Sequence, residues 1–413
     1  MFFYRGERAG CESGEGRAGV GNFCQMGVFK IYRDEMMLWL RGFIFLWAVA
    51  LLALGVLTVR RSPLRWNWKF ALFAGEFGHW LALGALGAGV ATWALRDGYD
   101  AWAYVTLSLI GFAMGLLLRP TVEAERIGRV LPAKLVAAFG EAMPTVEPFT
   151  LSGYFASGPA PVAVETREFA PGLRLDFFRA VERTSAPCVV VIHGGGWDGG
   201  DRQQLAELNH WLARRGFAVA AIDYRLAPQS IWPAQREDTL AALDFLKRQA
   251  VELGVDPERL VLFGRSAGGQ IASAVGYGSA DPAIRGVVSF YAPHDMFFAY
   301  SSAREDDFLK SPQLMRQYLG GPPSMAQANY ESASGHQKVR VGSPPTLLVH
   351  GSIDTLVWNQ HSVRLQARLA EARVPHVYVE LPWATHAFEY NLTGPGGQLA
   401  TYALAGFLHA VTK

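Results

Sequence analysis

Cysteine is scarce in this chain of 413 residues, and so is any cluster of metal-binding side chains. The three cysteines, Cys11, Cys24 and Cys188, are odd in number and lack the paired spacing of metal ligands. We therefore expect free thiols, with Cys188 packed in a strand, and neither a disulfide framework nor a metal site.

An excess of positive charge is also lacking, because 38 Lys and Arg residues face 36 Asp and Glu residues and leave a net charge of +2. The sequence contains no stripe of basic residues with interleaved aromatic residues. These two absences exclude a nucleic acid as the expected partner.

Charged residues are nearly absent from three stretches of the N-terminal third. Residues 42–59 and 101–118 are uncharged runs of 18 residues, and residues 70–95 are apolar apart from Glu76 and His79. A helix of this length crosses a hydrocarbon core of about 30 Å. A signal peptide would have a shorter apolar stretch and a small-residue cleavage site, whereas two arginines follow the first run. The sequence predicts about three transmembrane helices, with the lipid bilayer as a partner.

Glu76 and His79 stand three residues apart, on one face of the second predicted span. An ionisable pair at this depth is costly unless it faces protein or water. We expect the two side chains to bond to each other and fix helix packing. The alternative is a polar site that handles an ion or a lipid, with the rest of the chain as an accessory.

Composition divides the chain into four parts. Residues 1–35 are rich in Gly, Arg and Glu without periodicity, so we assign no structure there, and Met36 or Met37 could be the true start. The other parts are a membrane region, a linker or cap helix and a globular domain, at residues 36–118, 119–160 and 161–413.

Lys and Arg residues flank the predicted spans unevenly. The side of the globular domain carries Arg60, Arg61, Arg65, Lys69, Arg119, Arg126, Arg129 and Lys134. The opposite side offers Lys30, Arg33, Arg41 and Arg96. Because positive charge is enriched in cytoplasmic loops, we expect a multi-pass protein of the cell membrane with its globular domain in the cytoplasm.

Short β-rich runs alternate with longer amphipathic segments after about residue 161. This pattern is typical of an α/β fold, a largely parallel sheet covered by helices on both faces. The expected strands are 162–169, 173–180, 188–193, 217–223, 259–264, 286–291, 345–350 and 376–381. A Pro-Gly pair after the first strand indicates a hairpin.

The fifth expected strand runs into a Gly-x-Ser-x-Gly motif and then into an apolar helix. Gly264 and Gly268 remove side chains where the turn is tightest, so Ser266 can expose its hydroxyl at the helix N-terminus. This strand–turn–helix context predicts that Ser266 is a nucleophile.

The third expected strand ends in His193, Gly194, Gly195, Gly196 and Trp197. A run of glycines lets backbone N–H groups approach an oxyanion to about 3 Å. Neither a Gly-x-Gly-x-x-Gly nor a lysine-containing phosphate loop follows this strand, which disfavours a nucleotide. The run therefore predicts an oxyanion hole.

A serine hydroxyl needs a general base, which is itself oriented by an acid. Asp354 follows the seventh expected strand and His386 follows the eighth, in the order Ser, Asp, His. Both fall at the carboxyl ends of strands, where open α/β sheets bind ligands. His193 and His350 are rival bases, but each belongs to a strand-end motif that geometry explains better.

Residues 160–410 resemble the hormone-sensitive-lipase-like esterases and the related bacterial carboxylesterases and feruloyl-esterase-like hydrolases of the α/β-hydrolase superfamily. The motifs that carry the resemblance are those above, together with Asp-Tyr-Arg-Leu-Ala-Pro at residues 223–228. The resemblance implies an α/β-hydrolase fold with a mostly parallel eight-stranded sheet, and no metal or organic cofactor. It also implies a triad of Ser266, His386 and Asp354 and an oxyanion hole formed by Gly195, Gly196 and Ala267.

Two positions depart from the family pattern. Arg265 stands where hormone-sensitive-lipase-like members commonly carry Asp, and Thr355 stands where their acid loop usually has Pro. These departures favour the carboxylesterase and formamidase-like branch. In such hydrolases an insertion like residues 292–342 helps to build a cap, and its aromatic residues would line the pocket or form the core of the cap.

The sequence thus predicts a membrane-anchored serine hydrolase that cleaves a small, lipophilic carboxylic ester through an acyl-enzyme. One alternative is an amidase or formamidase that uses the same site. Another is a catalytically silent hydrolase fold that binds a ligand, although the nucleophile, base and acid are all present.

Overall fold

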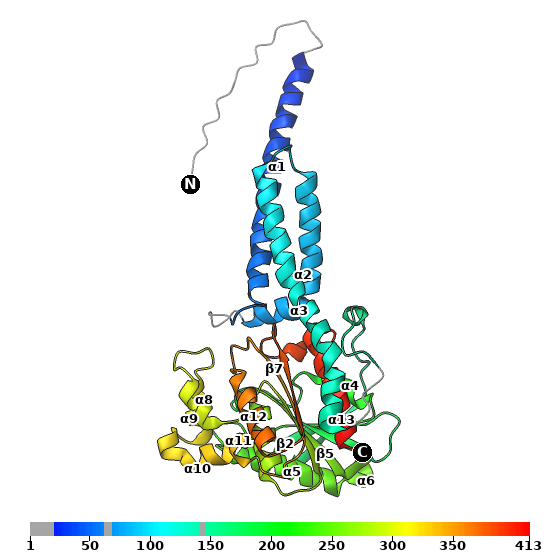
Figure 1. Ribbon diagram of the computed structural model, residues 1–413, viewed down its shortest axis with the longest axis vertical. Coiled ribbons are helices and arrows are strands. Elements are labelled where there is room, and N and C mark those ends of the chain that lie inside the picture. Colours follow the sequence, from blue (N-terminus) through cyan, green and yellow to red (C-terminus); the bar gives the residue numbers. More distant parts are fainter. Residues whose placement is uncertain (1–19, 62–67, 141–145) are drawn as a thin grey trace.

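Three long helices stand side by side at one end of the molecule (Figure 1). The structure, a computed structural model, describes residues 20–61, 68–140 and 146–413. The three helices are α1 (Val20–Val56), α2 (Trp68–Ala94) and α3 (Ala101–Phe139). All three are long and apolar enough to cross a membrane. Helix α1 includes residues 20–35, for which the sequence indicated no structure, whereas residues 1–19 lie outside the described residues.

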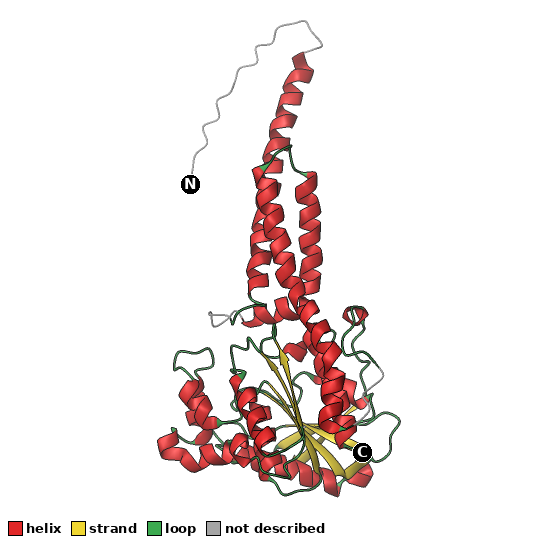
Figure 2. Cartoon of the chain, viewed as in Figure 1, coloured by secondary structure: helices red, strands yellow, loops and turns green. Residues whose placement is uncertain are grey.

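Helix α3 runs on from the bundle into the globular domain (Figure 2). Residues 119–139, expected to form a separate linker helix, instead continue α3 without a break. Pro120 has no N–H group to give to the carbonyl of Leu116, one turn earlier. The hydroxyl of Thr58 lies 3.2 Å from that carbonyl and 2.8 Å from the carbonyl of Gly55, so the two carbonyls share its hydrogen. Arg119 donates to the carbonyl of Thr58 at 2.7 Å. Contacts with the end of α1 therefore allow the helix to pass through a proline.

The globular domain is built on one sheet of eight strands in the order β1-β2-β4-β3-β5-β6-β7-β8. The pairs β1–β2 and β2–β4 are antiparallel, and the remaining pairs are parallel. The strands are β1 (Val164–Ala170), β2 (Leu173–Phe178), β3 (Ala186–Ile192), β4 (Ala218–Ile222), β5 (Val255–Arg265), β6 (Ile284–Phe290), β7 (Thr346–Gly351) and β8 (His376–Leu381). Each overlaps a strand expected from the sequence. Strands β3 and β4 are buried throughout, because helices cover both faces of a parallel sheet.

Two different groups of helices cover the two faces of the sheet. On one face, α4, α13 and the end of α3 share a core, in which the rings of Phe139 and Phe407 meet at 5.2 Å. The other face is covered by α5, α7, α12 and the cap insertion, which contains α8 to α11. The helices are α4 (Ala206–Ala213), α5 (Ala234–Arg248), α6 (Ala250–Leu253), α7 (Ala267–Gly278), α8 (Met296–Ser302), α9 (Ser311–Leu319), α10 (Pro323–Ala333), α11 (Gly335–Lys338), α12 (Gln360–Glu371) and α13 (Pro395–Val411). Two short 3-10 helices are η1 (Ser152–Phe155) and η2 (Phe388–Tyr390).

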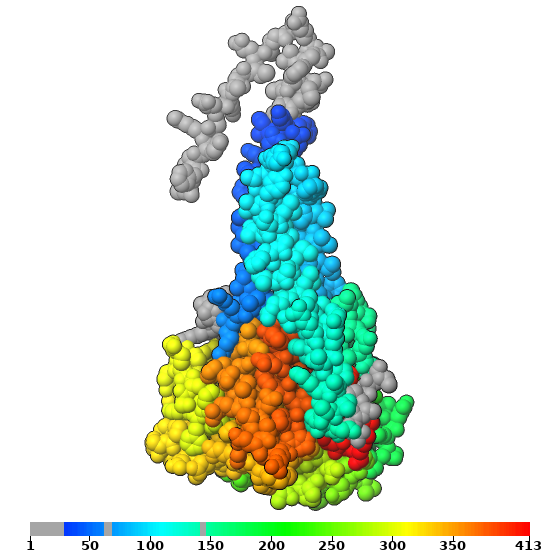
Figure 3. Space-filling model, viewed as in Figure 1, coloured from blue at the N-terminus to red at the C-terminus, as the bar shows by residue number. Residues whose placement is uncertain are grey.

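The space-filling view shows the bundle as a narrow stalk on a wide globular end (Figure 3). The end of α1, the start of α2 and the loops after β7 and β8 lie where stalk and domain meet (Figure 1). At this junction the three long apolar helices lie next to the carboxyl ends of the parallel strands.

Candidate active site

Ser266 occupies a sharp turn between β5 and α7. Its φ and ψ angles are 51° and −120°, a strained conformation for a residue with a side chain. Side chains at the flanking glycines would not fit. A Cβ at Gly264 would lie 2.1 Å from the carbonyl oxygen of Gly268, and one at Gly268 would lie 2.1 Å from that of Ile192. The turn thus has the conformation that the sequence predicted, with Ser266 at the start of α7.

The glycine loop after β3 brings backbone N–H groups to the same place. Gly195 and Gly196 have φ angles of 118° and 64°, which favour glycine, and the N–H of Gly194 donates to the side chain of Gln204 at 2.7 Å. Within the part of the chain that the structure describes, the N–H groups of Gly195, Gly196 and Ala267 have no hydrogen-bond acceptor. These three groups remain available for a ligand.

His193 has a structural place in this loop. Its Nδ1 lies 2.7 Å from the carbonyl oxygen of Gly194, and its ring stacks on Tyr224 with centroids 4.2 Å apart. Burial lowers the pKa of His193, so the ring is neutral. The next aromatic residue, Trp197, donates its indole N–H to Gln270 at 2.8 Å. These contacts shape the loop and leave His193 without a direct part in the chemistry.

Asp354 and His386 are brought together by the loops after β7 and β8. His386 Nδ1 lies 2.7 Å from Asp354 Oδ2, while Oδ1 accepts from the N–H groups of Leu356 at 2.8 Å and Val357 at 3.0 Å. Burial alone would raise the pKa of Asp354. The attraction of the neighbouring His386, whose Nδ1–H donates to the carboxylate, and of His350, whose Nε2 lies 3.4 Å from Oδ2, outweighs burial and holds that pKa below its ordinary value. The carboxylate is therefore ionised and fixed.

A buried ion pair ties the Ser266 turn to the His386 loop. Arg265 Nε donates to Glu389 Oε1 at 2.9 Å, and both side chains are almost fully buried. The hydroxyl of Tyr291 donates to the same oxygen, and the Tyr291 ring lies 4.3 Å from that of His386. Sequence reasoning noticed Arg265 but not Glu389 or Tyr291, because the pair joins residues that are 124 positions apart.

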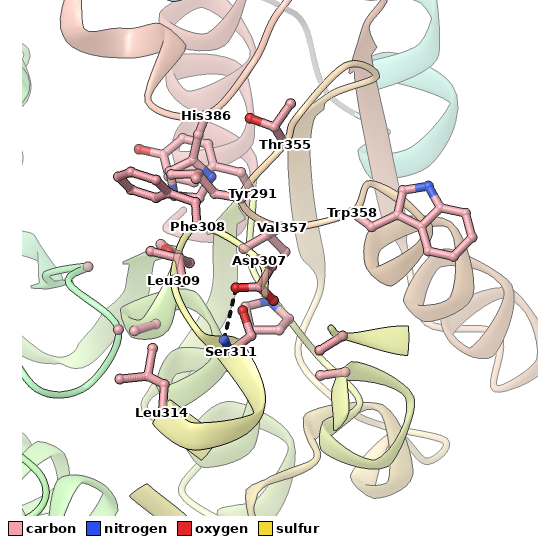
Figure 4. Close-up of a pocket in the computed structure, with 18 of the residues that line it drawn as sticks. Tyr291, Asp307, Phe308, Leu309, Ser311, Leu314, Thr355, Val357, Trp358 and His386 are labelled. Carbon is pink, nitrogen blue, oxygen red and sulfur yellow. Dashed lines mark hydrogen bonds between the residues drawn. The ribbon is translucent and has the colours of Figure 1, made fainter. Parts of the chain in front are cut away.

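A cavity of about 800 Å³ lies where these elements converge. It is lined by the glycine loop, Ser266 and His386, and by the cap residues Phe308 and Leu314. Figure 4 shows His386 and these two cap residues among the side chains that line the cavity. Tyr318, in contrast, is buried and stacks on Trp197 with centroids 4.4 Å apart. The insertion therefore has both of the expected features, because its aromatic residue Phe308 lines the pocket and Tyr318 belongs to the buried core.

Glu76 and His79 have separate partners. Glu76 accepts hydrogen bonds from Trp383 and Gly396 of the globular domain, whereas the His79 ring stacks on Tyr154 with centroids 3.6 Å apart. The prediction that these two side chains bond to each other is therefore wrong, because each of them contacts residues outside the bundle. Among the described residues, no group of three or more His, Cys, Asp or Glu side chains could hold a metal ion.

Comparison with known proteins identifies the class of this chain. The BD-FAE family model matches residues 175–369. The probable carboxylic ester hydrolase LipM of Mycobacterium tuberculosis is 28% identical over 361 residues, which cover 78% of this chain and 82% of LipM. Esterase LipW from Mycobacterium marinum is 25% identical, with a TM-score of 0.52 over 77% of this chain and 91% of LipW. A Pyrobaculum calidifontis esterase is 21% identical, with a TM-score of 0.54 over 70% of this chain and 94% of its own.

These similarities agree with the topology and confirm the predicted fold of the globular domain. The chain has the α/β-hydrolase fold and is a carboxylesterase-like hydrolase.

Proposed function

We propose that this chain is a membrane-anchored serine hydrolase that cleaves carboxylic esters through an acyl-enzyme. In this proposal Ser266 is the nucleophile, His386 the general base and Asp354 the acid that orients the base. The observation that carries it is that Ser266, in its strained turn, lines the same cavity as His386, which lies 2.7 Å from Asp354.

The hydrogen bond to Asp354 assigns a role to each nitrogen of His386. Nδ1–H donates to the ionised carboxylate, so Nε2 keeps a lone pair and takes the proton of Ser266 during attack on the ester carbonyl. The negative charge on the carbonyl oxygen is stabilised by the N–H groups of Gly195, Gly196 and Ala267. His386 then gives its proton to the leaving alcohol and activates the water that releases the acyl group.

A lipophilic ester is the substrate class that the cavity wall favours. The wall includes the apolar cap residues Phe308, Leu309 and Leu314, and Val357 from the loop after β7. Trp68, the first residue of α2, also lines the cavity. Helices long enough to span a bilayer thus reach the site itself, which suits an ester that partitions into lipid.

Membrane anchoring is supported by the three long apolar helices and by the distribution of charge. The described residues that follow α1 and the second half of α3 lie at the globular end and carry Arg60, Arg61, Arg119, Arg126, Arg129 and Lys134. By the positive-inside rule the catalytic domain faces the cytoplasm and the protein is multi-pass.

The direct test is hydrolysis of p-nitrophenyl esters of increasing chain length by the purified full-length protein, beside N-formylkynurenine. We expect ester hydrolysis that falls by several orders of magnitude in Ser266→Ala and is unchanged in Ser301→Ala, where an exposed serine of α8 is replaced. Retention of most activity by Ser266→Ala would refute the nucleophile, and cleavage of the formyl amide alone would identify a formamidase.

A further inference from the structure

The loop that carries His386 is held by a residue of the membrane bundle. Glu76 of α2 is buried, and its two carboxylate oxygens accept from two points on the domain. Oε1 accepts from the indole N–H of Trp383 at 3.2 Å, and Oε2 accepts from the backbone N–H of Gly396 at 2.9 Å. Asn391 adds a third contact, because its amide donates to the carbonyl of Glu76 at 3.1 Å.

The domain leaves space for this carboxylate. A Cβ at Gly394 would lie 2.4 Å from Glu76 Oε2, and a Cβ at Gly396 would lie 2.6 Å from Oε1. On the other side, a Cβ at Gly75 would lie 3.3 Å from the indole of Trp383. Small residues on both partners thus permit the close approach of α2 to the loop.

Glu76 also supplies a hydrogen-bond acceptor at the start of α13, where the helix itself has none. The residue at the helix N-cap is Gly394, which has no side chain to accept the free N–H groups of the first turn. The carboxylate of Glu76 accepts the N–H of Gly396 in that turn and lies at the positive end of the helix dipole. A membrane helix therefore caps a helix of the hydrolase domain.

His386 lies in the chain between these two points of attachment, three residues after Trp383 and ten before Gly396. Its ring is further supported by Tyr291 and by the Arg265–Glu389 pair on the domain side. We propose that Glu76 is a positioning residue for His386, so that helix α2 completes the catalytic site. This role rests on the proposed function, since it acts through the general base.

The test uses the full-length protein in nanodiscs and measures kcat and KM for a p-nitrophenyl ester. Glu76→Gln keeps the shape of the side chain but replaces one carboxylate oxygen by an amide NH2 group. That group is a donor and would face the N–H of Trp383 or of Gly396. We expect kcat to fall about tenfold to a hundredfold, with KM unchanged, because small displacements of a catalytic group have effects of this size. Trp383→Phe, which removes one donor to Glu76, should lower kcat in the same way. The double variant should be no worse than the more affected single variant, since both changes act through one contact.

Thr92→Val is the matched control, because Thr92 is also buried in α2 and its hydroxyl donates within the helix to Ala88 at 2.8 Å. It should leave kcat unchanged. Wild-type kcat in both Glu76→Gln and Trp383→Phe would overturn the positioning role, and so would a loss of activity that only matches a loss of folded protein. A wild type that neither hydrolyses esters nor reacts with a fluorophosphonate would instead overturn the proposed function.

Discussion

His350 and His386 both lie beside Asp354, and their hydrogen bonds distinguish them. Both nitrogens of His350 are occupied, since Nδ1 lies 2.8 Å from Ser362 Oγ and Nε2 lies 3.0 Å from the carbonyl oxygen of Val357. His386 uses Nδ1 for Asp354 and lines the cavity. This difference favours His386 as the base and His350 as a support for the acid loop.

We predict that His386→Ala lowers kcat by about 10³-fold or more, because the serine then has no base. His350→Gln should lower kcat far less, since it leaves the nucleophile and the base in place. Steady-state kinetics on one ester, with both variants checked for folding, decides between them. Equal losses in the two variants would contradict the assignment.

The Arg265–Glu389 pair makes a prediction about stability. Both side chains are almost completely buried, so removal of one partner leaves an uncompensated charge. Arg265→Met should lower the free energy of unfolding by about 3 to 5 kcal/mol. Arg265→Met combined with Glu389→Gln should recover most of that loss, because Tyr291 can still donate to the Gln oxygen. A double variant that is less stable than Arg265→Met would show that the buried charges do not act as a pair.

At the level of elements, the strands could be predicted well and the helix boundaries less well. The buried parallel strands appear in the sequence as short apolar runs such as Cys188 to Ile192, which turn residues delimit. A helix was predicted after Pro120, but its continuity with the preceding span was not, because proline normally ends or kinks a helix. The group that compensates for it, the hydroxyl of Thr58, comes from the turn after α1 and leaves no local signal.

This compensation can be tested by a pair of substitutions. Thr58→Val should destabilise the bundle by about 1 kcal/mol, because the carbonyls of Leu116 and Gly55 lose the hydroxyl that they share. In a Pro120→Ala background the cost should be smaller, since residue 120 again has an N–H to donate. Unfolding midpoints of the full-length protein in detergent measure both. An equal cost in the two backgrounds would contradict the explanation.

Across the whole molecule, the candidate nucleophile, base, acid and oxyanion loop could be predicted because each follows a strand in a short motif. The contacts between bundle and domain could not be predicted, since Glu76 and Gly396 are 320 positions apart. A carboxylate inside an apolar segment indicates only that a partner exists, and the fold decides where that partner lies.

Buried histidines should make the folded state sensitive to acid. Burial is the largest cause that lowers the pKa of His361, to about 3, below the ordinary value of about 6.5 that applies to the unfolded chain. Between these values the unfolded state binds the proton and the folded state does not. The contribution of His361 to the free energy of unfolding is therefore complete above about pH 6.5. As the pH is lowered below that value, it decreases by about 1.4 kcal/mol per pH unit.

His361→Gln should accordingly lose less stability between pH 6.5 and pH 4.5. The slope of its free energy of unfolding against pH should be smaller than that of the wild type by about 1.4 kcal/mol per pH unit. The exposed His409 offers a matched control, His409→Gln. Unfolding midpoints of the full-length protein across this range measure the slope. The same slope in wild type and His361→Gln would contradict the prediction.

The central claim, that Ser266 is an activated nucleophile in a membrane-anchored hydrolase, is tested most directly by fluorophosphonate labelling of intact membranes. We predict that the wild-type chain in the membrane fraction is labelled and that Ser266→Ala, present at the same level, is not. Labelling that persists in Ser266→Ala, or a wild type that stays unlabelled although it is folded, would contradict the claim.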